Sequence, residues 1–242
     1  MKSKTVLIFS GGLDSTTLLF QLLAAGDEVI PLSVDYGQRH ARELDAAALI
    51  VDLARHQYPN LCHEHQGVPL QFLPSLYGDG EGPQSSQLGH AEVPDGHYAD
   101  QTMKTTVVPN RNMIMLAIAA GCAQAWGADV VATAVHAGDH TIYPDCRIGF
   151  VAALRTAIQL ATLWSPVTLD APYVTISKAE IVARGVSVGA PLSETWSCYK
   201  GGDYHCGTCG TCVERREAFI LAGVPDPTVY LDNGPLPEEP RA

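Results

Sequence analysis

The chain has 242 residues, of which 46% are hydrophobic and 17% are charged, and its formal net charge is −11. This composition is typical of a folded globular protein, and the length suffices for one large domain, with or without a small appendage. The acidic balance argues against nucleic acid as the main partner, because binding to a phosphate backbone depends on clustered Lys and Arg. Apolar stretches as long as a signal or membrane-spanning segment are absent from the sequence, so we expect a cytoplasmic protein.

Strand and helix patterns alternate at the start of the chain. Residues 5–9 are an apolar, β-branched run, and residues 14–25 follow with helical spacing that ends at Gly26. Residues 28–37 predict a second strand, and residues 39–57 predict an amphipathic helix. This order predicts an α/β fold with a doubly wound, Rossmann-type parallel sheet and helices on both of its faces.

Residues 60–109 interrupt the alternation. They are rich in Gly, Pro, His and Gln and lack clear periodicity, which indicates either a functional lid or binding loop or a tolerated surface insertion. The segments expected after it are a buried helix at 111–127, a strand at 128–135, a helix at 148–164, and a strand, a helix (177–184) and a loop within 165–192. We predict two units, a nucleotide-binding domain over 1–190 and a metal-binding segment over 191–242.

The turn between the first strand and the first helix reads SGGLDSTT (10–17). A doubly wound fold binds anions at this place, on the positive end of the helix, and two glycines let the backbone approach phosphate oxygens. Asp14 suits a helix cap, a Mg²⁺ ligand, or both. The segment is neither a Walker A loop nor a dinucleotide fingerprint. It resembles the Ser-Gly-Gly-x-Asp-Ser loop of the N-type ATP pyrophosphatases, which implies an ATP-binding loop in preference to an ordinary glycine-rich turn.

Eleven consecutive residues are expected to contact ATP. They are Ile8, Phe9, Ser10, Gly11, Gly12, Leu13, Asp14, Ser15, Thr16, Thr17 and Leu18.

Four cysteines lie close together near the C-terminus, at C-x7-C-x2-C-x2-C spacing: Cys198, Cys206, Cys209 and Cys212. In a reducing compartment such a group indicates a metal more than disulfides. Four thiolates suit a closed, structural Zn²⁺ site, and an iron–sulfur cluster is the alternative. His205 is a competing ligand that a fourth cysteine makes unnecessary.

Polar residues also follow the predicted strands, whose C-terminal ends face the ligand crevice of such a fold. After the second strand, Tyr36 could stack on a base, and Gln38 or Arg39 could bind a carboxylate or phosphate. A polar turn that caps the next helix explains them equally well.

Two further groups of residues precede predicted helices. Arg111, beside Asn112, is well placed to neutralise phosphate charge, or is a solvated residue at a helix start. Tyr143, Asp145 and Arg147 follow the strand at 128–135, and we expect them to contact substrate because their loop should face the same crevice. His and Asp side chains of that loop offer an alternative metal site. Its cysteine could be a nucleophile, although packing is the simpler role.

Together, these segments resemble the 7-cyano-7-deazaguanine synthase family, which is similar in fold to other N-type ATP pyrophosphatases (adenine nucleotide α-hydrolase-like). The matching segments are FSGGLDSTT (9–17), DYGQRH (35–40), VPNRN (108–112), YPDCR (143–147), and ETWSCYKGG with HCGTCGTCVERREAF within 194–219. They span nearly the whole chain in order.

The resemblance implies a reaction. The family converts 7-carboxy-7-deazaguanine, ammonia and ATP to the nitrile, a precursor of queuosine and archaeosine, through an adenylated carboxylate and an adenylated amide. It also implies Mg²⁺, one structural zinc and a homodimer, and no membrane partner. Ser10, Asp14, Ser15 and Arg111 would act on the reacting phosphates.

Two other functions fit parts of the pattern. A ligase or thiolase acting on tRNA shares the ATP loop, but it would need a surface that holds RNA, against which the charge argues. A non-enzymatic zinc-ribbon module would have no use for the intact loop at Ser10–Ser15.

Overall fold

Five parallel strands form one sheet in the order β3-β2-β1-β4-β5. The structure is a computed structural model that describes residues 2–38, 42–77, 85–88 and 91–239. The strands are β1 (Lys4–Ile8), β2 (Glu28–Asp35), β3 (Gln66–Pro69), β4 (Val130–Ala132) and β5 (Thr168–Asp170). The strand order reverses beside β1, as it does in doubly wound folds, so the prediction of a parallel Rossmann-type sheet is confirmed.

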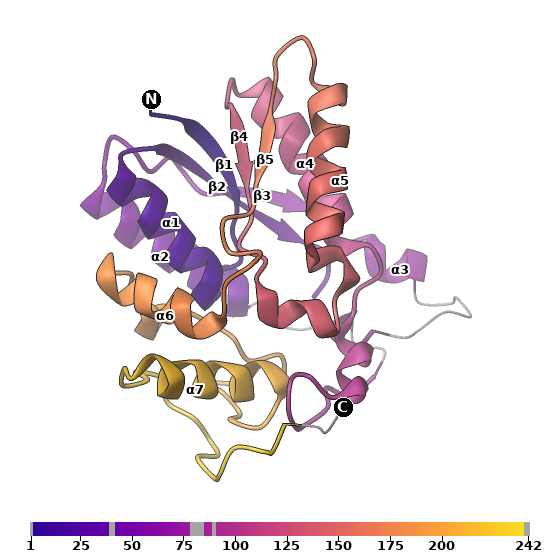
Figure 1. The fold of residues 1–242 in the computed structure, drawn as a ribbon, viewed down its shortest axis with the longest axis vertical. Helices are drawn as coiled ribbons and strands as arrows, with labels where there is room; N and C mark the ends of the chain where they lie inside the picture. Colours follow the sequence, from indigo (N-terminus) through magenta and orange to yellow (C-terminus); the bar gives the residue numbers. More distant parts are fainter. Residues whose placement is uncertain (1, 39–41, 78–84, 89–90, 240–242) are drawn as a thin grey trace.

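Helices cover both faces of this sheet (Figure 1). The α-helices are α1 (Leu13–Ala25), α2 (Arg42–Gln57), α3 (Leu73–Tyr77), α4 (Arg111–Ala125), α5 (Ile148–Ala161), α6 (Lys178–Ser187) and α7 (Gly210–Ala222). Short 3-10 helices lie at η1 (Ser86–Leu88), η2 (Gln101–Thr106), η3 (Ala137–Thr141), η4 (Pro144–Cys146) and η5 (Leu192–Glu194). In the part of the chain that is described, none of the helices has the length and apolar character needed to cross a membrane.

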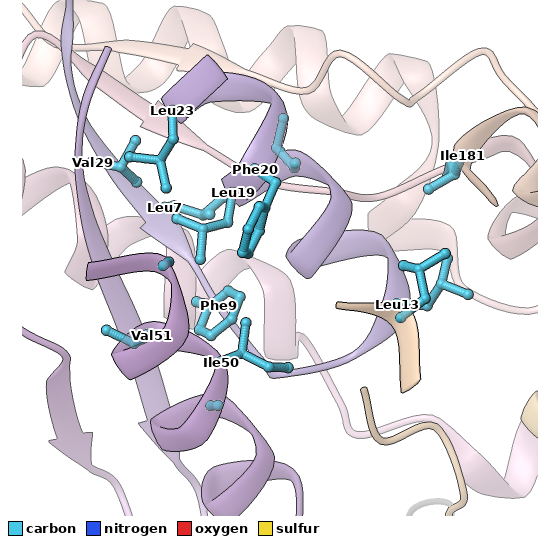
Figure 2. Close-up of a cluster of buried hydrophobic side chains, with 14 of the residues drawn as sticks. Leu7, Phe9, Leu13, Leu19, Phe20, Leu23, Val29, Ile50, Val51 and Ile181 are labelled. Carbon is cyan, nitrogen blue, oxygen red and sulfur yellow. The ribbon is translucent and has the colours of Figure 1, made fainter. Parts of the chain in front are cut away.

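The core divides into two layers because successive side chains of a strand point to opposite faces. Leu7 and Phe9 pack with α1 and α2 (Figure 2), whereas Val6 packs with α4 and α5 on the other face. At the end of α1, Gly26 adopts the left-handed conformation with φ of 90°, and its N–H donates to the carbonyls of Leu22 and Leu23. The helix end predicted at Gly26 is therefore confirmed.

The structure differs from the expected elements at two strands. The strand expected at 128–135 pairs as β4 only over Val130–Ala132, so residues 133–135 are free to line a cavity. Strand β3, within the segment expected to be a loop, was missed. It is four residues long and contains both Gly and Pro, which is tolerated because it lies at the edge of the sheet.

The C-terminal segment packs on the rest of the chain through α7. Ala218 and Phe219 of α7 lie in the same hydrophobic cluster as Leu13 and Ile181, and α7 runs beside α6 (Figure 1). This packing brings the C-terminal segment close to the C-terminal end of β1, where the N–H of Trp196 donates to the carbonyl of Gly11. The division of the chain near residue 190 stays a prediction.

Candidate functional site

A cavity of about 230 Å³ opens at the C-terminal ends of the central strands. Its floor comes from the end of β1 (Ile8, Phe9), from β2 (Ser33, Val34) and from residues 133–135. Ligands of doubly wound folds bind in this position, where the strand order reverses. The sequence motifs at 10–15, 36–38, 111–112 and 143 all reach this cavity.

The glycine-rich loop forms one rim of the cavity. Ser10 and Ser15 hold it together, because the backbone N–H of Ser10 donates to Ser15 Oγ at 3.3 Å and their two Oγ atoms lie 3.2 Å apart. Gly11 has φ of 75°, and a Cβ atom there would lie 2.5 Å from the backbone N of Ala47 in α2. Only glycine fits this position, since α2 packs directly against the loop.

The residues predicted to bind ATP fall into two sets. Those that line the cavity are Ile8, Phe9, Ser10, Gly12, Leu13, Asp14 and Ser15. Thr16, Thr17 and Leu18 are fully buried behind the loop, and Gly11 is not part of the lining. Their contact with ATP stays a prediction.

The proposed capping role of Asp14 is not observed. The N-cap of α1 is Gly12, without a side-chain hydrogen bond, and Asp14 is the second residue of the helix. Its Oδ2 atom lies 3.1 Å from Lys178 Nζ, while its buried Oδ1 atom has no hydrogen-bond partner among the described residues. Asp14 therefore lines the cavity with one oxygen held by Lys178 and the other buried and unpartnered.

Five charged or titratable side chains meet beside the loop, and we call them the charge cluster: Asp14, His136, Asp139, Lys178 and Glu214. Lys178 Nζ also contacts Glu214 Oε2 at 2.8 Å. His136 is 1% exposed, and its Nε2 lies 3.6–3.8 Å from the three carboxylates. Three acids thus surround one lysine and one histidine at the edge of the cavity.

The pKa values of the charge cluster reflect this crowding. Burial by itself would raise the pKa of Asp14, but the charges of Lys178 and His136 outweigh it and lower the pKa. For His136, burial by itself would lower the pKa, because it disfavours the charged imidazolium. The three carboxylates outweigh burial and raise the pKa of His136 above its usual value. The cluster therefore holds Asp14 as a carboxylate.

Arg111 and three tyrosines form another part of the cavity wall. The Nη1 atom of Arg111 donates to the hydroxyl of Tyr36 at 3.1 Å, and the guanidinium lies over the Tyr36 ring, 5.7 Å from its centroid. Tyr143 and Tyr199 also line the cavity here, and the hydroxyl of Tyr143 is hydrogen-bonded to Thr106 Oγ1. The wall offers flat rings and one half-buried cation.

The remaining candidates for substrate contact are placed differently. Gln38 lines the cavity, and its Oε1 accepts from the backbone N–H of Tyr36. Asn112 lines it as well. Asp145 accepts from the backbone N–H of Asn112 at 3.0 Å and so anchors the start of α4, and the exposed Arg147 donates to the carbonyl of a nearby residue in η3. Neither Asp145 nor Arg147 is part of the cavity lining.

Arg39 lies outside the described residues. A nucleophilic role for Cys146 is not supported, because the thiol is 4% exposed and burial raises its pKa well above the usual range. Its sulfur accepts from Asn112 Nδ2 at 3.2 Å. Packing at the base of the cavity explains this cysteine.

The four C-terminal cysteines converge on one point and form what we call the cysteine cluster: Cys198, Cys206, Cys209 and Cys212. Their sulfur atoms all lie within 4.8 Å of one another, and those of Cys206 and Cys212 are 3.8 Å apart. The backbone N–H groups of Cys209 and Thr208 donate to Cys206 Sγ, as expected for a thiolate. The group has the donor set and spacing of a structural metal site.

His205 is not part of this cluster. Its Nε2 accepts from the backbone N–H of Ser197 at 3.0 Å, and its ring packs on Trp196. The sequence allowed His205 as a competing metal ligand, but in the structure its Nε2 is used by Ser197 and it is not among the clustered ligand atoms.

Residues 91–106, the last part of the segment that interrupts the alternation, lie between the cavity and the cysteine cluster and contact both. Asp95 forms a β-bridge with Cys209, and Tyr98 donates to Glu217 Oε2 at 2.6 Å. Tyr98, Met103 and Thr106 line the cavity. The cysteine cluster therefore supports one wall of the candidate active site.

Comparison with known proteins decides the family. The family described as "Queuosine biosynthesis protein QueC" matches residues 4–223, which is most of the chain. The chain belongs to the QueC family.

Relatives within the family are similar over nearly their full length. A protein of Rhizobium johnstonii named 7-cyano-7-deazaguanine synthase is 54% identical over 230 residues, covering 95% of this chain and 92% of the relative. One of Brucella anthropi with the same name is 51% identical over 230 residues, covering 95% and 94%.

Among solved structures, "U34-tRNA thiolase NcsA from Methanococcus maripaludis with its [4Fe-4S] cluster" superposes with a TM-score of 0.44 at 14% identity, covering 78% of this chain and 58% of that one. A likeness this remote carries no argument about the QueC chain.

Three charged residues of the site were missed from the sequence: Glu43, Lys178 and Glu214. Each lies in the first two turns of an amphipathic helix, where a charged residue is usually solvated. The capping box of Ser177 and Glu180 can be read from the sequence and places Lys178 at the start of α6, but only the fold shows that this turn faces the glycine-rich loop.

Proposed function

We propose that this chain is an ATP-dependent 7-cyano-7-deazaguanine synthase, which converts 7-carboxy-7-deazaguanine and ammonia to the nitrile. The observation that carries the proposal is the identity of 51–54% with relatives of that name over 95% of the chain. The glycine-rich loop, Arg111 and the tyrosine wall facing one cavity agree with it.

The reaction requires two adenylations. The substrate carboxylate attacks the α-phosphorus of ATP, and pyrophosphate leaves. Ammonia then attacks the acyl carbon, the C–O bond to AMP breaks with its electron pair on oxygen, and the nitrogen loses a proton to give the amide. The amide oxygen attacks a second ATP at the same position. Loss of AMP and of both remaining N–H protons leaves the nitrile.

The loop residues would bind and orient the nucleotide. The hydroxyls of Ser10 and Ser15 lie at the positive end of α1 and would donate to phosphate oxygens. Arg111 would neutralise charge that develops on the phosphates, as a half-buried guanidinium with spare donors can. Pre-placed donors of this kind lower the barrier because they need no reorganisation during the reaction.

Mg²⁺ is proposed as the metal that accompanies ATP, and the unpartnered Oδ1 of Asp14 fits it, since Mg²⁺ takes carboxylate and phosphate oxygens. When bound, Mg²⁺ supplies charge neutralisation at the phosphates. Lys178 keeps Asp14 ionised and fixes its other oxygen at 3.1 Å.

Zinc is proposed for the cysteine cluster. A tetrahedron with Zn–S bonds of about 2.3 Å has sulfur–sulfur edges of about 3.8 Å, and the Cys206–Cys212 separation is 3.8 Å. In an iron–sulfur cluster each thiolate binds a different iron, which spreads the sulfurs further apart. The compact group therefore favours one metal ion, a choice that elemental analysis of the purified protein tests.

We also propose a cytoplasmic homodimer without a nucleic-acid partner. The net charge of −11 supports the last point. Light scattering tests the dimer, and salt-dependent binding of tRNA would contradict the absence of a nucleic-acid partner.

The deciding experiment is a mass-spectrometric assay with 7-carboxy-7-deazaguanine, ammonium, ATP and Mg²⁺. We expect nitrile and roughly two AMP per nitrile, one for each displacement at an α-phosphate. ATP binding without AMP or nitrile would leave the nucleotide site in place and remove the proposed substrate.

A further inference from the structure

Glu43 is the one carboxylate of the described cavity lining that has no cationic partner within ion-pair distance. Asp14, Asp139 and Glu214 each lie within 4 Å of Lys178 or His136. Glu43 lines the same cavity, but no described Lys, Arg or His lies within 4 Å of its carboxylate, and no described residue donates a hydrogen bond to it.

The position of Glu43 is fixed by the fold. It is the second residue of α2, whose first turn packs so tightly on the glycine-rich loop that a Cβ at Gly11 would lie 2.7 Å from the Glu43 carbonyl. Burial raises the pKa of Glu43 to about 7, and Arg111 only partly offsets this effect. The half-buried carboxylate has thus lost part of its water without gaining a donor from the described residues, which leaves it suited to a ligand that brings donors.

The surroundings of Glu43 describe that ligand. Tyr36 and Tyr199 present aromatic rings, which suit a flat heterocycle, and Arg111 uses one N–H on Tyr36 and keeps others for an acceptor. A guanine-type ring offers two adjacent donors, N1–H and the 2-amino group, next to the O6 acceptor. A carboxylate accepts both donors at once, and a guanidinium suits O6.

We propose that Glu43 selects the 2-amino-pyrimidinone edge of the substrate by accepting hydrogen bonds from N1–H and the 2-amino group. This inference rests on the proposed function, because that function supplies a substrate with a guanine-type ring. The Glu43 carboxylate also excludes the adenine of ATP from this position. Adenine offers an acceptor at N1, which a carboxylate repels, so the nucleotide base occupies the strand-end side of the cavity near Ser33 and Val34.

The test compares two bases on three proteins. The bases are 7-carboxy-7-deazaguanine and its analogue without the 2-amino group, 7-carboxy-7-deazahypoxanthine. The proteins are the wild type, Glu43→Gln, and the control Asp45→Asn, which changes an exposed carboxylate of the same helix turn that does not line the cavity.

For the wild type and for Asp45→Asn, we expect kcat/KM to fall about 10- to 100-fold when the 2-amino group is removed. Glu43→Gln should lose a similar factor on the full substrate through KM, keep the KM of ATP, and show little further loss on the analogue. Glu43→Asp keeps the carboxylate and should retain the preference for the 2-amino base with weaker binding. An unchanged ratio between the two bases in Glu43→Gln would overturn the proposal.

Failure of the proposed function has a different signature. If the wild type makes no nitrile, calorimetric binding of 7-deazaguanine and 7-deazahypoxanthine still tests Glu43. The wild type should prefer the first base, and Glu43→Gln should bind both alike. Equal binding of the two bases by the wild type would remove the role of Glu43. Melting temperatures of the variants show whether each is folded before either comparison is made.

Discussion

The cysteine cluster and the cavity wall around Glu43 and Asp14 are both at least partly buried, yet they differ in how their polar atoms are satisfied. In the cysteine cluster, four sulfurs lie within 4.8 Å of one another, and those of Cys198 and Cys206 also accept backbone N–H groups. In the cavity wall, Asp14 Oδ1 has no partner and Glu43 has no donor among the described residues.

This contrast separates stability from binding. A closed set of ligands around a metal contributes folding free energy and leaves no position for a substrate. Uncompensated groups cost stability, and they persist where a ligand compensates them. The charge cluster lies between the two, because Lys178 balances Asp14 and Glu214 while one buried oxygen of Asp14 has no partner among the described residues.

The largest expected effect is at the closed site. Cys209→Ser removes one of four thiolates from a fully buried position. Structural zinc contributes on the order of 10 kcal/mol, which is comparable to the whole stability of a domain. We expect loss of soluble, metal-containing protein in expression trials and elemental analysis. Cys122→Ser, on α4 and outside the cluster, is the control, and a stable Cys209→Ser protein with full metal content would break the comparison.

The next effect is at the charge cluster. Lys178→Met leaves Asp14 and Glu214 without their shared cation in a place where Lys178 is only 11% exposed. Removing one partner of a buried ion pair costs about 3–5 kcal/mol, which lowers the melting temperature by roughly 10 °C in a chain of this size. Calorimetry checks the shift. Lys104→Met, at an exposed position of η2, should stay within about 0.5 kcal/mol of the wild type. An equal shift in both variants would refute the role of the pair.

A smaller change in stability, with a specific loss of binding, is expected at the loop. Gly11→Ala strains a backbone with φ of 75° and places a methyl group 2.5 Å from the Ala47 nitrogen. The strain costs about 1–3 kcal/mol and displaces the loop from α2, so titration calorimetry should show weaker ATP binding. Gly121→Ala, in an open position of α4, should gain up to about 1 kcal/mol in stability and bind ATP normally. Normal ATP affinity in Gly11→Ala would show that the loop does not need this packing.

The smallest expected effect is at Glu43 and is a gain in stability, in contrast to the loss expected at the cysteine cluster. The folded pKa of Glu43 is about 7, above its usual 4.5, so the folded state holds the proton more tightly. The contribution of Glu43 to stability is therefore full below pH 4.5 and is lost as the pH rises through 7. Glu43→Gln removes this loss.

We expect the free energy of unfolding of Glu43→Gln at pH 8 to exceed that of the wild type by on the order of 1 kcal/mol, after allowance for solvent screening. The variant should therefore melt at a higher temperature at pH 8, with little difference near pH 4.5. Thermal melts of both proteins across this range provide the measurement. A variant that is less stable at pH 8 would mean that the carboxylate has a partner in the folded chain.

Features encoded locally were predictable. Residues 5–25 carry a strand, a turn and a helix in one continuous stretch, and the spacing of Cys206, Cys209 and Cys212 nearly dictates a common metal site. The strand β3 was not predictable in the same way, because four residues with Gly and Pro have little strand preference of their own. Pairing with β2 holds β3 in the sheet.

The sequence by itself therefore determined the fold class, the position of the glycine-rich loop and the cysteine cluster, since each depends on neighbours within a few residues. Only the tertiary structure decided which charges meet at the cavity. Lys178 and Glu214 each look like solvated side chains in the sequence, and only the packing of α1, α6 and α7 sets them against Asp14. It also turned Asp145 to the start of α4 and left Glu43 facing the cavity, because the direction of a side chain depends on how its helix packs.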